Sequence, residues 1–260
     1  AAFTGVFNLF FALGYTPESL QRAVMKMLYK GGGGRDRTAA YRPISLTSAI
    51  LKIYETVLLN RTKKVLTDHR KLLKYLTKEG ISHMQGAGRT RMGTLETIAE
   101  LLEMMLGKRK WTLLSYDLSC KAFDRVPIDA LMAKLRGKGI RGRLLQAIRS
   151  TYKEASTRIR AGGTHSKRGH FQRGVRQGSV LSPLLFVNLI FVDDLLDTLR
   201  VRLSHVKPSP AKMYMDDLQV LVESAADLLT AHRVVYTWCA GWDGVTNEGK
   251  FAALQKGMKI

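Results

Sequence analysis

The sequence predicts an α+β fold, in which strands and helices do not alternate in a repeating βα pattern. Residues 111–117, WTLLSYD, form a short apolar run typical of a buried strand, and residues 212–223, KMYMDDLQVLVE, resemble a hairpin with two aspartates at its tip. In the first strand of this hairpin, Met213 and Met215 are expected on one face and Tyr214 on the other. Segments with helical spacing of apolar residues separate these strands. The expected order of strand, helices, hairpin, helix, hairpin and helix is that of an α+β protein.

The expected elements follow in chain order. Four glycines at 31–34 mark a flexible loop, after which helices are predicted at 47–66, capped by Thr47 or Ser48, and from 94 to about 106. After the strand at 111–117, Pro127 suits the first turn of a helix. The remaining predictions are a helix at 141–152, a hairpin pairing 155–160 with 169–173, a helix at 181–197 and a last helix at 225–240.

Composition indicates a globular protein with a polyanionic partner. The chain has 260 residues, 45% of them hydrophobic, a mean hydropathy of −0.09 and a net charge of +21. Because neutralised phosphates release counterions, such a charge favours nucleic acid binding. A membrane surface is the alternative, but the basic residues are scattered and form no single juxtamembrane block.

Other features narrow the class of protein. Two cysteines, Cys120 and Cys239, make neither a disulfide framework nor a zinc motif, so we expect a reducing compartment. The longest apolar stretch, 180–196, is interrupted by a proline, an asparagine and two aspartates, which argues against a membrane span. The first fifteen residues lack the basic region of a signal peptide. They begin with Ala, so we expect a fragment of a longer chain.

Three pairs of aspartates are candidate metal ligands: Asp117 with Asp124, Asp193 with Asp194, and Asp216 with Asp217. The middle pair is interpreted as the polar end of an amphipathic helix. The other two pairs follow or cap strands, where two carboxylates can hold two Mg²⁺ ions for in-line phosphoryl transfer. An acidic turn without function is the alternative for a lone Asp-Asp pair.

Five segments in order resemble the blocks of a reverse transcriptase domain from non-LTR (LINE-like) retrotransposons. They are YRPISL (41–46), DLSCKAFDRV (117–126), GVRQGSVLSPLLF (174–186), YMDDL (214–218) and NEGK (247–250). The resemblance implies a right-hand polymerase core, with helical and β fingers at 1–110 and a ferredoxin-like antiparallel palm at 111–260. Residues 127–153 are candidates for returning to the fingers. No thumb or endonuclease is visible in the sequence.

The resemblance implies a catalytic role for four residues. Asp117 and Asp216 correspond to the two metal-binding aspartates, and the carbonyl of Leu118 is a further expected ligand. Asp217 corresponds to the second aspartate of the turn, which supports the site and binds metal less directly. Lys250 corresponds to a general acid for the leaving pyrophosphate, although a lone lysine in a basic chain is usually a surface residue.

Substrate-binding residues are implied in the same way. Lys30 and Arg42 correspond to residues that bind the triphosphate, whose oxygens suit a point charge and a fork of donors. Gln177 and Gly178 correspond to a turn close to the template base and the nucleotide. Phe123 corresponds to the aromatic gate against a ribose 2′-hydroxyl. The segment QGAGRTRMGT (85–94) retains the Gln, Arg and Thr of a fingers block.

One departure affects the gate. The family spacing places the aromatic residue five positions after the first aspartate, whereas Phe123 lies six after Asp117, as if Cys120 were inserted. Either a bulge restores Phe123 to the gate, or Ala122 occupies it and sugar selection is relaxed.

The implied activity is RNA-directed DNA synthesis with two Mg²⁺ ions, or Mn²⁺ in their place, an RNA template, a DNA primer and dNTPs. We expect no membrane partner and an intracellular protein of the nucleus with a cytoplasmic ribonucleoprotein stage. The sequence leaves the oligomeric state open. The alternatives are an inactive, basic nucleic-acid-binding remnant and an RNA-dependent RNA polymerase, against which YMDD in place of GDD argues.

Overall fold

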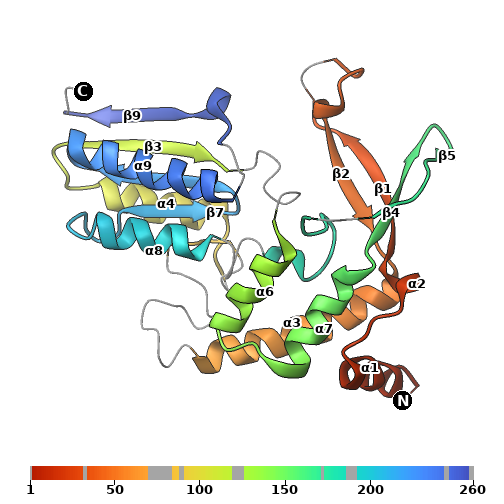
Figure 1. Ribbon diagram of the computed structural model, residues 1–260. Coiled ribbons are helices and arrows are strands. Elements are labelled where there is room, and N and C mark those ends of the chain that lie inside the picture. The colour runs from red at the N-terminus through yellow and green to blue at the C-terminus, as the bar shows by residue number, and fades with distance from the viewer. Residues whose placement is uncertain are drawn as a thin grey trace. The chain divides into compact units, whose positions relative to one another are not determined.

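Two separate sheets organise the chain, and each belongs to its own compact unit. The computed structural model describes residues 2–31, 34–69, 84–87, 91–118, 126–170, 173–185, 192–242 and 246–257. The first unit comprises Ala1–Leu66 with Pro127–Pro183, and the second comprises Thr67–Val126 with Leu184–Ile260. Both units combine helices with a sheet (Figure 1).

The sheet of the first unit has the order β2-β1-β4-β5, with β6 also paired to β4. β1 pairs antiparallel with β2 and parallel with β4, and β4 pairs antiparallel with both short strands. The strands are β1 (Arg22–Tyr29), β2 (Tyr41–Leu46), β4 (Ser156–Ala161), β5 (Thr164–His165) and β6 (Gly169–His170).

An aromatic cluster joins two helices of the first unit. Tyr54 is fully buried, with the ring of Phe7 stacked at 5.5 Å and that of Phe10 edge-on at 5.7 Å, both centroid distances. Such pairs add to the stabilisation from area burial. The helices are α1 (Ala2–Leu13), α2 (Glu18–Gln21), α3 (Ala49–His69), α6 (Ile128–Gly137) and α7 (Gly142–Lys153), with the 3₁₀ turn η1 (Thr38–Ala40).

Two buried charged residues fix the glycine-rich segment of the first unit. Glu55 on α3 is 1% exposed and accepts the backbone N–H of Val180 at 2.9 Å. Arg176 is 2% exposed and donates to the carbonyl of Thr151. Burial raises the pKa of the Glu55 carboxyl, while the bond from Val180 and the charge of Arg176 oppose that rise. The pair thereby ties residues 176–180 to α3 and α7.

The sheet of the second unit is antiparallel and has the order β7-β8-β3-β9. Its strands are β3 (Trp111–Asp117), β7 (Ala211–Tyr214), β8 (Asp217–Val222) and β9 (Ala252–Lys256). β3 is a central strand because its residues pair on one side with β8 and on the other with β9. The predicted strand at 111–117 and the predicted Asp-Asp hairpin are confirmed.

Helices cover the two faces of this sheet differently (Figure 1). On one face Tyr116 is buried and its hydroxyl lies 3.0 Å from Nδ1 of His232 on α9, and α8 packs beside α9. On the other face Lys212 pairs at 2.5 Å with Glu100 on α4. The helices are α4 (Thr94–Met105), α8 (Asp193–Arg202) and α9 (Ala225–Gly241), with η4 (Glu248–Lys250) before β9.

Two predictions from the sequence are wrong in their details. Asp193 and Asp194 form the first turn of α8, which continues to Arg202, and are not the polar end of a helix at 181–197. Acidic residues at a helix start interact favourably with its dipole, which explains their place. Met215 does not share a strand face with Met213, since it lies in the turn with φ of +57°.

The other predicted helices and the hairpin following α7 are present. α3, α4, α6, α7 and α9 lie within a few residues of their expected positions, and β4 pairs with β5 and β6. Among the described residues, no helix combines the length and apolar character that a membrane crossing requires.

Replacing Glu55 by Ala is expected to destabilise the first unit. The change removes a carboxylate whose charge favours the buried guanidinium of Arg176, and it leaves the Val180 N–H without an acceptor. We expect the free energy of unfolding to fall by about 1–3 kcal/mol, the cost of an unsatisfied buried donor, measured by urea denaturation. Lys64→Ala, at an exposed position of the same helix, serves as the control and should change it by less than about 0.5 kcal/mol. Equal losses in both variants would contradict the role of the pair.

Candidate functional site

The end of β3 and the start of β8 bring two aspartates opposite each other. Asp117 is the last residue of β3, and the antiparallel register pairs it with Asp217, the first residue of β8. Asp216 precedes it in the turn, and its carbonyl accepts the backbone N–H of Leu118 at 2.9 Å. Residues almost a hundred positions apart in the sequence therefore meet at one end of the sheet.

A cation faces this group from the loop before β9. Nζ of Lys250 lies 2.7 Å from Oδ2 of Asp117. The side-chain amide of Asn247 donates to the same oxygen at 3.3 Å, and its backbone N–H donates to the carbonyl of Asp117 at 3.0 Å. Asn247 was not singled out from the sequence, although it begins the NEGK block. The structure therefore places Lys250, which the sequence singled out, against Asp117.

Burial and electrostatics at this end of the sheet raise the pKa of two carboxyls, those of Asp216 and Asp217. Burial raises the pKa of Asp216, and repulsion from Asp217 and Asp117 raises it further. The pKa of Asp217 is raised by partial burial and by the charge of Asp117. The hydrogen bond to Asp117 raises the pKa of Lys250, so its ammonium stays charged at neutral pH. An additional cation would relieve the remaining repulsion.

The oxygen atoms at this end of the sheet suit a hard divalent cation whose remaining ligands are water and phosphate. Asp117 and Asp217 lie opposite each other at this end of the sheet, Asp216 and Leu118 are their chain neighbours, and Mg²⁺ prefers carboxylate and carbonyl oxygens as ligands. Among the described residues no group of three His, Cys, Asp or Glu side chains is placed to hold a metal ion by itself. Mg²⁺ usually needs only one or two carboxylates, with water and substrate phosphates completing its shell. The residues therefore fit a site that is completed by a phosphate-bearing substrate.

The four remaining described candidates lie together in the first unit. Lys30 directly follows β1, its N–H bonds the carbonyl of Ala40 at 2.8 Å, and Arg42 lies on the partner strand opposite Leu28. Because residues 28 and 30 point the same way along a strand, both cations share one face of the hairpin. Both are exposed.

The glycine-rich turn is attached to the same hairpin. The backbone N–H of Ser45 on β2 donates to the carbonyl of Gln177 at 2.7 Å. Gly178 has φ of +116°, and a Cβ added there would lie 2.5 Å from the carbonyl oxygen of Ser45. Only glycine allows this approach, so Gly178 is required by the backbone contact alone.

The sugar gate lies outside the described residues. Phe123, Ala122 and Cys120 all fall between 118 and 126, as does Asp124. The two alternatives for the gate therefore remain predictions from the sequence.

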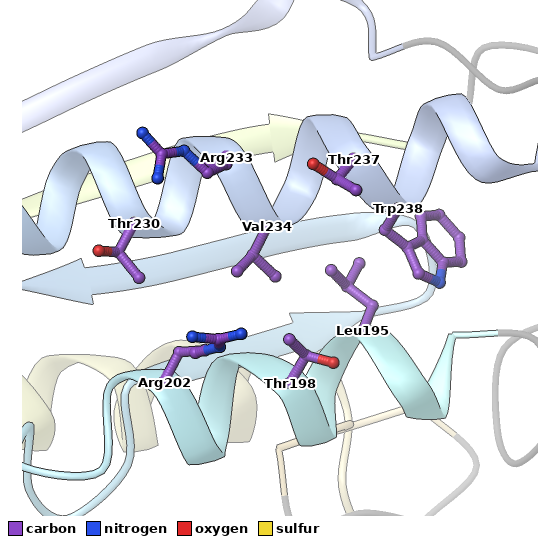
Figure 2. A pocket seen from close by; sticks show the side chains of 8 residues that line it. All are labelled: Leu195, Thr198, Arg202, Thr230, Arg233, Val234, Thr237 and Trp238. Carbon is purple, nitrogen blue, oxygen red and sulfur yellow. The ribbon is translucent and has the colours of Figure 1, made fainter.

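A pocket of about 430 Å³ lies in the second unit, between α8 and α9 (Figure 2). Leu195 and Val234 face each other across it, and the indole of Trp238 closes one end. Arg202 and Arg233 stand on the two facing helices, and in the view their guanidinium groups do not converge. The pocket is on the face that carries α8 and α9 and buries Tyr116, whereas the alternation of side chains turns Asp117 to the opposite face. It is therefore not part of the carboxylate site.

Comparison with known proteins places this geometry in a family. The family model "Reverse transcriptase (RNA-dependent DNA polymerase)" matches residues 30–260. The chain is 26% identical over 247 residues to a probable RNA-directed DNA polymerase from transposon BS of Drosophila melanogaster, covering 91% of this chain. It is 28% identical over 258 residues to the RNA-directed DNA polymerase from mobile element jockey of Drosophila funebris, covering 95%. It spans about a quarter of the length of these relatives, 26% and 27% respectively.

Solved structures agree on the fold. Apo telomerase from Candida tropicalis, truncated from the C-terminal domain, superposes with a TM-score of 0.66 at 13% identity, covering 94% of this chain and 52% of that one. Telomerase from Candida albicans, in complex with a fragment of telomeric RNA, gives 0.63 at 12% identity, covering 98% and 46%. The fold is thus that of a right-hand polymerase core, as the sequence predicts.

Replacing Asp216 by Asn is expected to stabilise the metal-free protein at neutral pH. A carboxyl whose pKa is raised on folding contributes stability below its unfolded pKa and loses it as pH rises through the folded value. At pH 7 the ionised group is therefore destabilising. We expect the variant's Tm in EDTA to be higher by on the order of 2–4 °C, and the difference to disappear near pH 3.

Asp197→Asn is the matched control, because Asp197 carries a favourable ion pair with Arg200 at 3.4 Å. Its Tm should not rise at pH 7. A pH-independent gain in Asp216→Asn would contradict the electrostatic explanation.

Proposed function

We propose that this chain, which belongs to the reverse transcriptase family, extends a primer 3′-hydroxyl with dNTPs on an RNA template. The observation that carries the proposal is the opposition of Asp117 and Asp217 across β3 and β8, with Lys250 bonded to Asp117. Reverse transcriptase function follows from the family, whereas the activity, substrates and partners of the whole protein are proposals.

Asp117, Asp216 and the carbonyl of Leu118 would hold two divalent ions, with Asp217 supporting them. When bound, Mg²⁺ or Mn²⁺ supplies charge that stabilises the attacking and leaving oxygens of in-line phosphoryl transfer. The protein's part is to present these oxygens from a strand end and a tight turn. The bond from the Leu118 N–H to the Asp216 carbonyl keeps the two elements together.

Lys250 is proposed as the proton donor to the leaving pyrophosphate. Its raised pKa keeps the ammonium protonated, and the bond to Asp117 directs it toward the carboxylates. The Asp117 carboxylate would be shared between a divalent ion and this ammonium. From its place beside Asp117, the ammonium would give its proton to an oxygen of the leaving pyrophosphate.

The first unit would bind the nucleotide and the template. Two cations, Lys30 and Arg42, on one face of the β1–β2 hairpin suit the oxygens of a triphosphate. Gln177 and Gly178 form a close backbone turn attached to the same hairpin, at which a base pair can be approached without a side-chain obstacle.

We assign the unit of residues 1–66 and 127–183 to the fingers and the unit of 67–126 and 184–260 to the palm. This assignment differs from a single boundary at residue 110. It rests on sheet membership, because β4 of 156–161 pairs with β1, whereas β9, β7 and β8 join β3.

RNA and DNA are the proposed partners. The net charge of +21 suits a polyanion, and one of the similar telomerases was solved with a fragment of telomeric RNA. The relatives named above are RNA-directed DNA polymerases of mobile elements, which favours a retrotransposon RNA as the template.

Primer extension by the purified chain should require Mg²⁺ and Asp216. We expect Asp216→Asn to reduce extension on an RNA template by on the order of 10³-fold or more, since the metal contributes several kcal/mol of charge stabilisation. RNA affinity, measured by fluorescence anisotropy across a salt series, should change by less than about threefold, because it comes from the basic surface.

The same assay separates the alternatives. Incorporation of rNTPs alone would indicate an RNA-dependent RNA polymerase, and RNA binding without any Mg²⁺-dependent extension would indicate an inactive remnant. Equal extension by wild type and Asp216→Asn would refute the metal assignment.

Lys250→Gln should lower kcat by on the order of 10²-fold or more, the range of a single general acid. The decline of wild-type rate at alkaline pH, where the ammonium deprotonates, should be absent in the variant. Lys256→Gln, at an exposed position of β9, is the matched control and should retain the wild-type profile. If the rate of Lys250→Gln still declines at alkaline pH, another group donates the proton.

A further inference from the structure

Residues 84–87 pack against the strand that leads into the Asp-Asp turn. The backbone N–H of Met213 on β7 donates to the carbonyl of Met84 at 2.7 Å, and the N–H of Gly86 donates to the carbonyl of Met213 at 2.7 Å. These bonds form a parallel bridge between Gln85 and Met213. On its other side the segment meets α4, where a Cβ added to Gly86 would lie 2.1 Å from Oγ1 of Thr97.

The side chain of Gln85 binds the backbone of the Asp-Asp turn from within the protein. Its side chain is buried, with the whole residue 1% exposed. Oε1 accepts the backbone N–H of Met215 at 3.2 Å, and Nε2 lies 3.4 Å from the carbonyl oxygen of the same residue, which it approaches as a donor. Oε1 also accepts the N–H of Ala87 at 3.0 Å, which fixes the amide itself.

Met215 needs such a partner because its backbone is strained. Its φ of +57° lies in the left-handed region, which is costly for a residue with a Cβ and persists only where the surroundings enforce it. The carbonyl of Met215 belongs to the peptide that precedes Asp216. Fixing that peptide therefore fixes the direction in which the Asp216 carboxylate leaves the turn.

We propose that Gln85 is a positioning residue, which aims the Asp216 carboxylate at a divalent cation by holding the peptide groups on both sides of Met215. The proposal rests on the proposed function for its catalytic meaning. It concerns metal binding directly, so it can be tested without turnover. Nothing in the reverse-transcriptase resemblance assigned this task to Gln85, which the sequence placed in a fingers block.

The amide is the side chain that suits both bonds. A carboxylate of the same shape can accept from the Met215 N–H, but it cannot donate to the Met215 carbonyl and would add a negative charge near the aspartates. Methionine keeps a similar length and fills the buried space without either bond. Gln85→Glu therefore loses the bond to the Met215 carbonyl and adds a charge, whereas Gln85→Met loses both bonds to Met215 and adds no charge.

The first experiment measures Mn²⁺ affinity by electron paramagnetic resonance in the purified chain. Outer partners that orient a metal ligand typically contribute about 10–100-fold in metal affinity. We expect Gln85→Met and Gln85→Glu to weaken Mn²⁺ binding by on the order of tenfold. The midpoint of Mg²⁺ dependence in primer extension should rise in parallel, with little change in RNA affinity.

Gln219→Met is the matched control. Gln219 lies on β8, two residues after Asp217, and donates to the hydroxyl of Ser115 at 2.8 Å, with no part in the turn. Its loss should leave Mn²⁺ affinity within about twofold of wild type, which is well below the effect expected for an orienting partner. A comparable loss in this variant would show that any amide near the aspartates matters equally, and would overturn the proposal.

A double-mutant cycle with Met215→Gly tests whether Gln85 acts through the strained backbone of Met215, and it separates that effect from a general loss of structure. Glycine adopts the left-handed conformation without strain, so in the Met215→Gly background Gln85→Met should weaken Mn²⁺ binding less than it does in wild type. A structural defect unrelated to the turn would give the same loss in both backgrounds, which would refute the positioning role. Circular dichroism and Tm identify any variant that fails to fold.

The two proposals fail in distinguishable ways. If wild type binds Mn²⁺ but extends no primer, the proposed function is wrong and the Gln85 proposal is still decided by the Mn²⁺ affinities. If wild type binds no Mn²⁺ at these aspartates, or if Gln85→Met binds it as tightly as wild type, the positioning role is overturned.

Discussion

Mutual repulsion among three aspartates is the constraint on which the second unit depends. Asp117 and Asp217 are paired across β3 and β8, and Asp216 precedes the latter, so their charges cannot separate without loss of sheet register. Burial, and after it this repulsion, raises the pKa of Asp216. A folded protein that keeps such a group must supply a compensating cation, which Lys250 does in part. The remaining negative charge favours a further cation at this end of the sheet.

The sheet order explains how these groups meet. Because β3 is central, its end is held by β8 on one side and by the loop entering β9 on the other. The antiparallel pairing of β9 brings the residues just before it, Asn247 to Lys250, to the end of β3 where Asp117 lies. Side chains alternate along β3, so Tyr116 packs against α9 while Asp117 turns to the opposite face of the sheet. A carboxylate carried by a strand that is paired on both sides is more rigid than one on a loop.

The local spacing of apolar residues was enough to predict most helices and strands, but not which distant segments pair with one another. The strand at 111–117 and the hairpin around Asp216 follow from short apolar runs with period two, and α4 and α9 from helical spacing. β9 was missed because its residues, AALQK, are all exposed and carry no burial pattern. The strained Met215 was misassigned to a strand face, since nothing in its own side chain signals a positive φ. The opposition of Asp117 and Asp217 depends on register, which local sequence does not specify.

Charge compensation and geometry are distinct requirements of this site, and different residues meet them. Lys250 offsets negative charge, a task that a bound cation can equally perform, and its exposed side chain is free to change partners. Gln85 carries no charge and is buried, so it cannot relieve repulsion, and no ion can take over its two bonds to Met215. Repulsion alone would turn the Asp216 carboxylate away from its neighbours. An Asp216 carboxylate with a fixed direction therefore requires an uncharged group that holds the turn, and a buried amide can both accept from the N–H of Met215 and donate to its carbonyl.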